Sequence, residues 1–314
     1  MSLSSSGLDW YHPIAQCARH CTLKRMALDD AGGFKTMIEC PNIQKSVIRN
    51  HYDISTLFYR LMWGPHIHHG YWLAKESPQA AQIQLTSTLA GLASTQPNSV
   101  VYDIGCGMGG SSIWLAKNLQ CHVTGVTLSP VQRRWASTSA SLKRISPRPT
   151  FRCEDAESTQ FPNLSADVVW SIECTEHLFN KPAFFEKAAS WLKPGGRFAL
   201  CAWLAGESPM SESHEQQAMR VCEGMFCPSL GSQSDYVGWF ERAGLKVTAK
   251  GIWTNQVKQT WEICRKRVER TGVRYLAKVL GKNHVLFLDH FDAILNAYNS
   301  GAMEYGYFIA EKPT

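Results

Sequence analysis

The sequence has little of what marks a secreted, membrane-spanning or metal-clustering protein. Its 11 cysteines include no C-x-x-C pair, and the closest spacings, Cys17 to Cys21 and Cys222 to Cys227, match neither a zinc site nor a redox motif. The longest apolar run, 198–206, is far shorter than the roughly 20 residues that a transmembrane helix needs. The N-terminal residues lack the apolar core of a signal peptide. We therefore expect a reduced, cytoplasmic chain whose only membrane contact would be peripheral.

Charge of one sign is also scarce. The 314 residues include 32 Lys+Arg and 26 Asp+Glu, a net charge of +6 at pH 7, which falls well short of a nucleic-acid-binding tail. Hydrophobic residues make up 44% of the chain and charged residues 18%, so the chain can bury a large core. Composition thus excludes a disordered chain and a disulfide-stapled mini-protein, and we expect no nucleic acid among the partners.

From residue 98 onward the sequence alternates short β-branched runs with helical stretches, which is typical of an α/β fold. Buried strands are predicted at 99–105, 121–128, 150–156, 167–173 and 196–204, with a helix near 111–118 and a turn at 193–196. Strands joined by helices imply a mostly parallel sheet with right-handed crossovers. We predict a Rossmann-like domain over 98–314, preceded at 1–97 by a helical cap with an aromatic and histidine-rich segment.

The alternation breaks after Gly206. Two further strands are predicted at 244–253 and 305–313, the last of them antiparallel, with a long helical segment between them. We interpret about 206–240 and 254–300 as lid insertions over the carboxyl ends of the strands.

A glycine-rich turn follows the first predicted strand of the domain. Asp103 precedes three glycines spaced two residues apart, where main-chain N–H groups and a helix N-terminus can meet a ligand. A dinucleotide-binding domain would carry an acidic residue about 20 residues later to hold the ribose, but residues 125–132 contain none. A nicotinamide or flavin enzyme is therefore the weaker alternative, beside a tight turn that binds nothing and a cofactor-binding scaffold without chemistry.

Several ordered motifs resemble those of class I S-adenosylmethionine-dependent methyltransferases. They are DIGCGMGGSS at 103–112, VTGVTLSPVQ at 123–132, EDA at 154–156, VVWSIECTEHL at 168–178 and WLKPGGRF at 191–198. The similarity is strongest to the γ-tocopherol and sterol C-methyltransferase group, which shares TLSPVQ, E-x-x-EH, a YD-x-S segment and a WG-x-H-x-HHG segment. It covers about 46–204 well, and it indicates the cofactor far more specifically than the acceptor.

The resemblance implies which residues hold the cofactor. They are Tyr52, Asp103, Gly105, Gly107, Gly109, Thr127, Leu128, Gln132, Asp155 and Ala156. The glycines would surround the methionyl and ribose part, TLSPVQ would flank the ribose and adenine, and Asp155 with Ala156 would meet the adenine edge. Tyr52 would reach the cofactor's carboxylate or close the methyl pocket. TLSPVQ replaces the acidic residue that the wider family commonly has there, and it matches only this subgroup.

The candidate chemical groups follow the strand predicted at 167–173. Glu173, Glu176 and His177 lie at its end, where ligands bind in open α/β sheets. When a carbon atom accepts the methyl group, positive charge develops and a proton must then leave. We predict that Glu173 stabilises this charge and that His177 is the base, with Glu176 beside them. The alternative is that Glu176 and His177 only cap the next helix.

The WGPHIHHGYW segment, 63–72, gathers aromatic and imidazole groups. We expect the acceptor to contact Trp63, His68, His69, Tyr71, Trp72 and Trp203. Aromatic faces attract a sulfonium or a carbocation. A packed aromatic helix is the alternative, and His-x-His-His as a metal site is the weakest interpretation, because no Asp or Cys of suitable spacing accompanies it. We predict no metal.

The stretch 258–282 is predicted to be a basic helix. Its cations are Lys258, Arg265, Lys266, Arg267, Arg270, Arg274, Lys278 and Lys282, against two acidic residues. It is a solvated helix face, a peripheral membrane contact or a phosphate site. The overall prediction is a methyltransferase that acts on carbon of a small lipophilic acceptor of isoprenoid or aromatic type. A prenyl diphosphate C-methyltransferase, with or without cyclisation, and an O- or N-methyltransferase of a small natural product remain alternatives.

Overall fold

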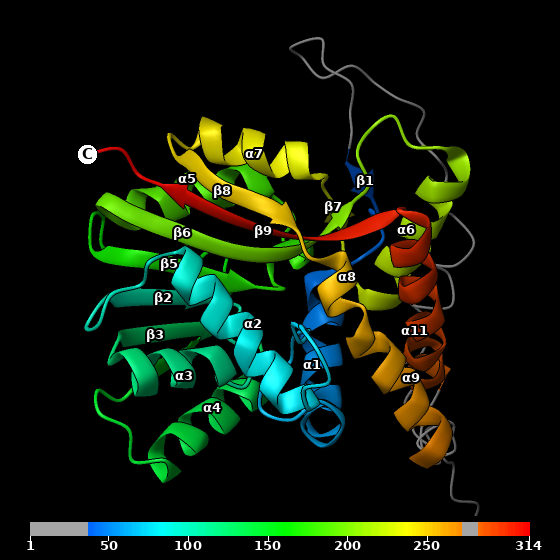
Figure 1. Ribbon diagram of the computed structural model, residues 1–314, viewed down its shortest axis with the longest axis horizontal. Coiled ribbons are helices and arrows are strands. Elements are labelled where there is room, and N and C mark those ends of the chain that lie inside the picture. The colour runs from blue at the N-terminus through cyan, green and yellow to red at the C-terminus, as the bar shows by residue number, and fades with distance from the viewer. Residues whose placement is uncertain (1–36, 272–281) are drawn as a thin grey trace, which may run out of the picture.

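Seven strands form one sheet at the centre of the structure, a computed structural model that describes residues 37–271 and 282–314 (Figure 1). The sheet order is β4-β3-β2-β5-β6-β9-β8; β9 is antiparallel to both β6 and β8, and the other pairs are parallel. The strands are β2 (Val100–Ile104), β3 (His122–Thr127), β4 (Thr150–Cys153), β5 (Ala166–Ile172), β6 (Leu192–Ala205), β8 (Lys246–Ile252) and β9 (Met303–Glu311). The predicted mostly parallel sheet with an antiparallel last strand is confirmed.

Helices surround this sheet. They are α1 (Lys45–Met62), α2 (Pro78–Leu92), α3 (Gly110–Leu119), α4 (Pro130–Leu142), α5 (Lys181–Trp191), α6 (Glu212–Met225), α7 (Gln233–Arg242), α8 (Thr254–Val257), α9 (Gln259–Thr271) and α11 (Lys282–Ser300), with a short 3-10 turn, η2 (Thr175–His177). Two short strands, β1 (Ile38–Glu39) and β7 (Ser229–Leu230), pair antiparallel outside the main sheet. No helix in the described residues is both long and apolar enough to cross a membrane.

The core divides at the sheet because side chains alternate between its two faces. On β5, Val168 and Trp170 pack toward one face with α2 and α3, whereas Val169 packs toward the other with α5 and α7. The first face continues into α6, α9 and α11, which cover the carboxyl ends of the strands together with α1 (Figure 1). This cover provides the walls of the site described below.

The sequence starts these helices with strong local signals. Ser77, Ser129 and Ser211 accept a hydrogen bond from a backbone N–H of the first turn of α2, α4 and α6, and Ser232 forms a reciprocal capping box with Asp235 on α7. Proline occupies the first turn of α2 and α4, where its missing N–H costs nothing. Helix positions were therefore predictable from sequence.

Three details differ from the sequence-based expectation. The segment 193–196 lies inside β6 as an irregularity in its pairing with β5, because Gly195 adopts a φ of +73° and lets the strand continue past it. The segment 206–240 divides: α6 packs on α11 in the cover, whereas α7 packs beside α5 on the opposite face. Residues 1–36 of the expected cap, and Arg274 and Lys278 of the expected basic helix, lie outside the described residues.

Candidate active site

The glycine turn between β2 and α3 uses each glycine differently. Gly105, Gly107 and Gly109 all have positive φ, at +80°, +53° and +77°. A Cβ at Gly105 would lie 2.3 Å from the Cβ of Cys174, and one at Gly109 would lie 2.9 Å from side chains of α4 and β4. A Cβ at Gly107 would meet only Ile67 Cδ1, at 3.9 Å. The first and third glycines thus permit close packing, and the backbone of Gly107 borders open space that a ligand can occupy.

Asp103, which precedes this turn, is directed inward. Its carboxylate accepts a hydrogen bond from the Ser112 hydroxyl of α3, so it ties β2 to the helix that follows. Burial raises the pKa of Asp103 to about 7, although the bonds from Ser112 act in the opposite direction. The side chain fixes the shape of the turn.

The TLSPVQ segment is held by side chains on both sides. Thr127 donates to Gln132 Oε1 at 2.8 Å, and both side chains are buried. Ser129 caps α4 and also donates to the carboxylate of Asp53 on α1. Leu128, half-buried, packs against the core between them. The loop is therefore fixed in shape and attached to α1.

The loop after β4 is also attached to α1. Lys45 Nζ lies 2.6 Å from Asp155 Oδ2 and 2.6 Å from Glu157 Oε2, and Asp155 Oδ1 accepts from the backbone N–H of Glu157 at 2.9 Å. The carbonyl oxygen of Ala156 accepts from Lys187 Nζ at 3.1 Å. The loop end that the resemblance assigns to adenine is thus rigid, and the Asp155 carboxylate is already paired with a cation.

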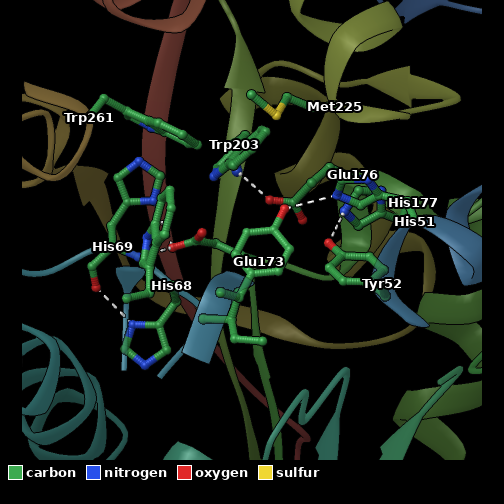
Figure 2. A pocket seen from close by; sticks show the side chains of 13 residues that line it. His51, Tyr52, His68, His69, Glu173, Glu176, His177, Trp203, Met225 and Trp261 are labelled. Atoms are coloured by element: carbon green, nitrogen blue, oxygen red, sulfur yellow. Dashed lines mark hydrogen bonds and ion pairs between the residues drawn. The ribbon is translucent and has the colours of Figure 1, made fainter. Parts of the chain in front are cut away.

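A cavity lies where β5 and β6 end, and the cover helices enclose it (Figure 2). Its wall consists of five groups of aromatic and aliphatic side chains and six ionisable ones; the lining residues are His51, Tyr52, Tyr59, Trp63, Ile67, His68, His69, Glu173, Glu176, His177, Trp203, Met225 and Trp261. The three predicted catalytic residues are brought together here, with four of the six predicted acceptor-contacting residues. The wall contains no Lys or Arg among the residues that the structure describes.

Glu173 is the buried carboxylate of this cavity. Its Oε1 accepts three hydrogen bonds, from the His69 backbone N–H at 2.8 Å, from His69 Nδ1 at 2.9 Å and from the Tyr305 hydroxyl at 2.8 Å. Burial opposes ionisation, but the neighbouring His69 ring and its hydrogen bonds outweigh it and hold the pKa of Glu173 below its usual value. The backbone of Glu173 has a φ of +53°, an unfavourable conformation that often occurs at functional sites. A fixed negative charge therefore faces the cavity.

Glu176 has the opposite electrostatic character. Its Oε1 accepts from the Trp203 backbone N–H at 3.0 Å, whereas Oε2 is buried and has no partner among the described residues. Burial raises the pKa of Glu176 to about 8, so the group is a neutral acid at pH 7. Because Oε1 accepts, the proton belongs on Oε2, and the cavity wall presents an unsatisfied donor there.

Tyr52 and His177 form a bonded pair on the same wall. The Tyr52 hydroxyl and His177 Nε2 lie 2.9 Å apart, and His177 Nδ1 lies 3.1 Å from the carbonyl oxygen of Phe226. A carbonyl oxygen can only accept, so Nδ1 carries the proton and Tyr52 donates to Nε2. Burial lowers the pKa of His177 to about 4, which keeps the ring neutral. His51 and Tyr59 form a second such pair at 2.9 Å.

The other histidines of the 63–72 segment bond to one another. His66 Nδ1 lies 3.0 Å from His68 Nε2, and His68 Nδ1 donates to the carbonyl oxygen of His69 at 2.7 Å. Burial lowers the pKa of both rings, so they are neutral. Nowhere in residues 37–271 or 282–314 do three His, Cys, Asp or Glu side chains come together as metal ligands would.

The predicted acceptor residues divide into two groups. Those on the cavity wall are Trp63, His68, His69 and Trp203. Tyr71 instead packs edge-on against Trp253, with ring centroids 4.9 Å apart, and Trp72 borders a second, smaller cavity. The turn at Gly70 separates the two groups, since a Cβ there would lie 2.6 Å from the Trp72 ring.

Sequence reasoning missed several cavity residues. Tyr59 lies seven residues after Tyr52 on α1, so helical periodicity could have found it. Trp261 on α9, Met225 on α6 and Tyr305 on β9 reach the site from segments without a motif. Only the tertiary fold shows that they belong to it.

Known proteins resemble the chain in sequence. Residues 102–200 match the family described as "Methyltransferase domain". A probable chloroplastic tocopherol O-methyltransferase of Oryza sativa subsp. japonica is 32% identical over 233 residues, which are 69% of this chain and 64% of the rice protein. The chloroplastic tocopherol O-methyltransferase of Arabidopsis thaliana is 26% identical over 285 residues, which are 85% of this chain and 82% of that protein.

The fold has relatives as well. A cyclopropane synthase from Mycobacterium tuberculosis superposes with a TM-score of 0.76 at 18% identity, over 86% of this chain and 99% of that one. At this identity the likeness concerns the fold alone. The sequence motifs, the matched domain and the named relatives agree with one another where a nicotinamide enzyme, a flavin enzyme or an inert scaffold would not. The chain belongs to the class I S-adenosylmethionine-dependent methyltransferases, and S-adenosylmethionine is its cofactor.

Proposed function

We propose that the enzyme methylates a carbon atom of a small, uncharged, lipophilic acceptor that carries an aromatic or isoprenoid group. The observation that carries this proposal is the ionised Glu173 inside a cavity walled by the rings of Tyr59, Trp63, Trp203 and Trp261. The carboxylate and the ring faces both stabilise positive charge in a place from which water is largely excluded.

The residues of the glycine turn fit the cofactor. Gly107 offers space beside the backbone at the start of α3, and the fixed TLSPVQ and EDA loops lie at the ends of the neighbouring strands β3 and β4. Gly107 would border the methionyl and ribose part, Thr127, Leu128 and Gln132 would flank the ribose, and the loop at Asp155 and Ala156 would border adenine. S-adenosylmethionine supplies, when bound, a methyl group on a positively charged sulfur.

Carbon is favoured as the acceptor atom because of the basicity of the cavity groups. A carbon that has just received a methyl group bears positive charge and is a strong acid, so a base of low pKa can remove its proton. Glu173, with a lowered pKa, and His177, with a pKa of about 4, are such weak bases. We assign charge stabilisation to Glu173 and proton removal to the Tyr52–His177 pair, in which Tyr52 hands its own proton to His177 Nε2.

The wall favours an uncharged acceptor with an oxygen atom. A diphosphate would need Arg, Lys or a metal ion, whereas the described cavity wall has no Lys or Arg and presents the Glu173 carboxylate. Glu176 Oε2, protonated and without a partner, can donate to a hydroxyl or carbonyl oxygen of the acceptor. A phenol or quinol with an isoprenoid chain has both features, and tocopherol, which the named relatives methylate, is of this class.

One observation favours O-methylation as a second candidate. Removing the proton of a phenol requires a stronger base, and Glu176, with a pKa of about 8, has the appropriate strength once it is ionised. The two candidates use Glu176 in opposite protonation states. Transfer to carbon needs the acid, so its rate should fall as the pH rises through 8, whereas transfer to oxygen needs the base, so its rate should rise.

Incubation with an acceptor panel tests the proposal. The purified chain, S-adenosylmethionine and quinols, chromanols, sterols or prenyl diphosphates are incubated in parallel, with and without EDTA, and products are analysed by mass spectrometry. The proposal predicts that a neutral phenol or quinol gains the mass of one CH₂ group and that EDTA has no effect. Methylation of prenyl diphosphates alone, or its loss with EDTA, would contradict it.

A further inference from the structure

We propose that one outer face of the enzyme, at α1 and the adjoining ends of α3 and α4, docks onto an anionic lipid surface. We call it the docking face and define it by Ile54, Leu57, Arg60, Leu61, Lys117, Leu142 and Lys143. The inference concerns exposed residues outside the cavity and stands apart from the acceptor's identity, although an acceptor dissolved in a membrane would give the docking a purpose.

The first observation is an apolar stripe in contact with solvent. Ile54, Leu57 and Leu61 of α1 are 62%, 58% and 76% exposed, and their spacing of three and then four residues places them on one side of the helix. Leu142, at the end of α4, is 79% exposed. Single exposed leucines are common, but a row of them on one helix indicates a surface that binds something apolar.

The second observation is a group of cations beside this stripe. Burial and then repulsion from Lys117 and Arg60 lower the pKa of Lys143, which shows that these three cations, from the ends of three helices, lie close together. Helices α1, α3 and α4 carry six Lys or Arg side chains and one acidic side chain, Asp53. Asp53 is already engaged by Ser129 and lies 3.8 Å from Arg49. The face is therefore complementary to negative charge.

An anionic lipid surface fits both observations at once. Leucines enter the acyl boundary while neighbouring cations bind headgroups, as in interfacial amphipathic helices. A nucleic acid would use the cations and leave the leucines exposed. The described part of the basic helix predicted at 258–282 differs, because α9 interleaves its cations with Glu262 and Glu269, pairs Arg265 with Asp292 at 3.3 Å and has no large exposed apolar side chain.

The docking face and the cavity share one helix. The opposite side of α1 contributes His51, Tyr52 and Tyr59 to the cavity wall, while Leu57 and Leu61 face outward. Figure 1 shows α1 at the open end of the molecule, between α2 and α4 on one side and α9 on the other. A lipid surface against this face would therefore lie one helix diameter from the site, about 10 Å.

Vesicle co-sedimentation of the full chain tests the inference without any acceptor. The probes are vesicles of phosphatidylcholine with about 30 mol % phosphatidylglycerol and vesicles of phosphatidylcholine alone. Two variants alter the face: Arg60→Gln with Lys143→Gln, and Leu57→Gln with Leu61→Gln. Two matched controls remove the same groups elsewhere: Lys266→Gln with Arg270→Gln on α9, and Leu164→Gln. Circular dichroism and methyl transfer to a water-soluble acceptor check that each variant is folded.

The inference predicts that the wild type binds the anionic vesicles and that each face variant reduces partitioning roughly tenfold, since two cations or two leucines are lost. The controls should bind like the wild type. Unchanged binding of the face variants, loss in the α9 control, or no binding of the wild type would overturn it. So would dissociation of a dimer by Leu57→Gln with Leu61→Gln, or DNA binding that depends on Arg60 and Lys143 but not on the leucines. Failure of methyl transfer with intact vesicle binding would contradict only the proposed function.

Discussion

At the scale of single residues, the site depends on two neighbouring glutamates in opposite protonation states. Glu173 has three hydrogen-bond donors on one oxygen and stays ionised, whereas Glu176 has one donor and an unpaired buried oxygen and stays protonated. Environments that separate the pKa values of two nearby acids are a common way to assign them different tasks. Here they divide charge stabilisation from hydrogen-bond donation.

Glu173→Gln tests the assigned charge. Glutamine keeps the shape and can accept from His69 and Tyr305, but it removes the negative charge. We expect turnover to fall on the order of 10²-fold or more with unchanged affinity for S-adenosylhomocysteine, measured by single-turnover kinetics and calorimetry. Glu186→Gln, an exposed glutamate of α5, is the matched control. Wild-type turnover in Glu173→Gln would exclude the role.

Glu176 should make the fold less stable as the pH rises. Its pKa of about 8 in the folded chain lies above the ordinary carboxyl value of 4.5. Between these values the unfolded chain releases the proton and the folded chain keeps it, so the free energy of unfolding decreases with pH. Glu176→Gln removes this dependence, and its stability relative to the wild type should rise by up to a few kcal/mol between about pH 5 and pH 8. Urea unfolding at a series of pH values measures it, and parallel curves would be inconsistent with a raised pKa.

The residue types of the site were accessible from sequence, but their electrostatics were not. The E-x-x-EH motif at the end of a strand indicates where carboxylates and an imidazole meet a ligand. His177 alone suggests a base that titrates near 6.5, whereas burial beside Tyr52 and Phe226 lowers its pKa to about 4. Those neighbours come from residues 125 positions earlier and 49 positions later in the chain. A local pattern carries no information about them.

At the scale of elements, α1 connects the cofactor loops to the acceptor cavity. Its first residue, Lys45, bridges Asp155 and Glu157, its middle binds the TLSPVQ loop through Asp53, and Tyr52 and Tyr59 line the cavity. The strands around these loops were predicted within a few residues, because buried parallel strands read as short β-branched runs. The connections made by α1 were not predicted, since ion pairs across more than 100 residues leave no periodic signal.

The glycine turn gives a prediction at this scale. Gly107→Val should abolish cofactor binding, because the side chain would occupy the open space that the turn borders. Gly244→Val is the matched control: Gly244 also has a positive φ, +75°, and nothing within 4 Å of its Cβ position, so it bears the same backbone strain far from the turn. Calorimetry with S-adenosylhomocysteine measures both variants. Equal loss in the two would attribute the effect to strain instead of to a filled site.

At the scale of the whole molecule, the sheet supplies a fixed platform and the cover helices decide what can enter. The cavity volume, about 40 Å³, is enough for about three water molecules, since each needs roughly 10–15 Å³. An acceptor with an isoprenoid chain therefore enters only if walls contributed by α1, α6 and α9 move apart. Those walls also hold the residues that sequence reasoning missed, Met225 and Trp261, because the cover is assembled from segments without recognisable motifs.

The destination of the methyl group tests the account most directly. The enzyme is incubated with S-adenosylmethionine carrying a ¹³C-labelled methyl group and the best neutral phenol or quinol of the panel, and the product is examined by carbon NMR. The account predicts a labelled methyl bound to carbon, at a rate that falls as the pH rises through about 8, where Glu176 ionises. A labelled methyl bound to oxygen, with a rate that rises over the same range, would contradict it.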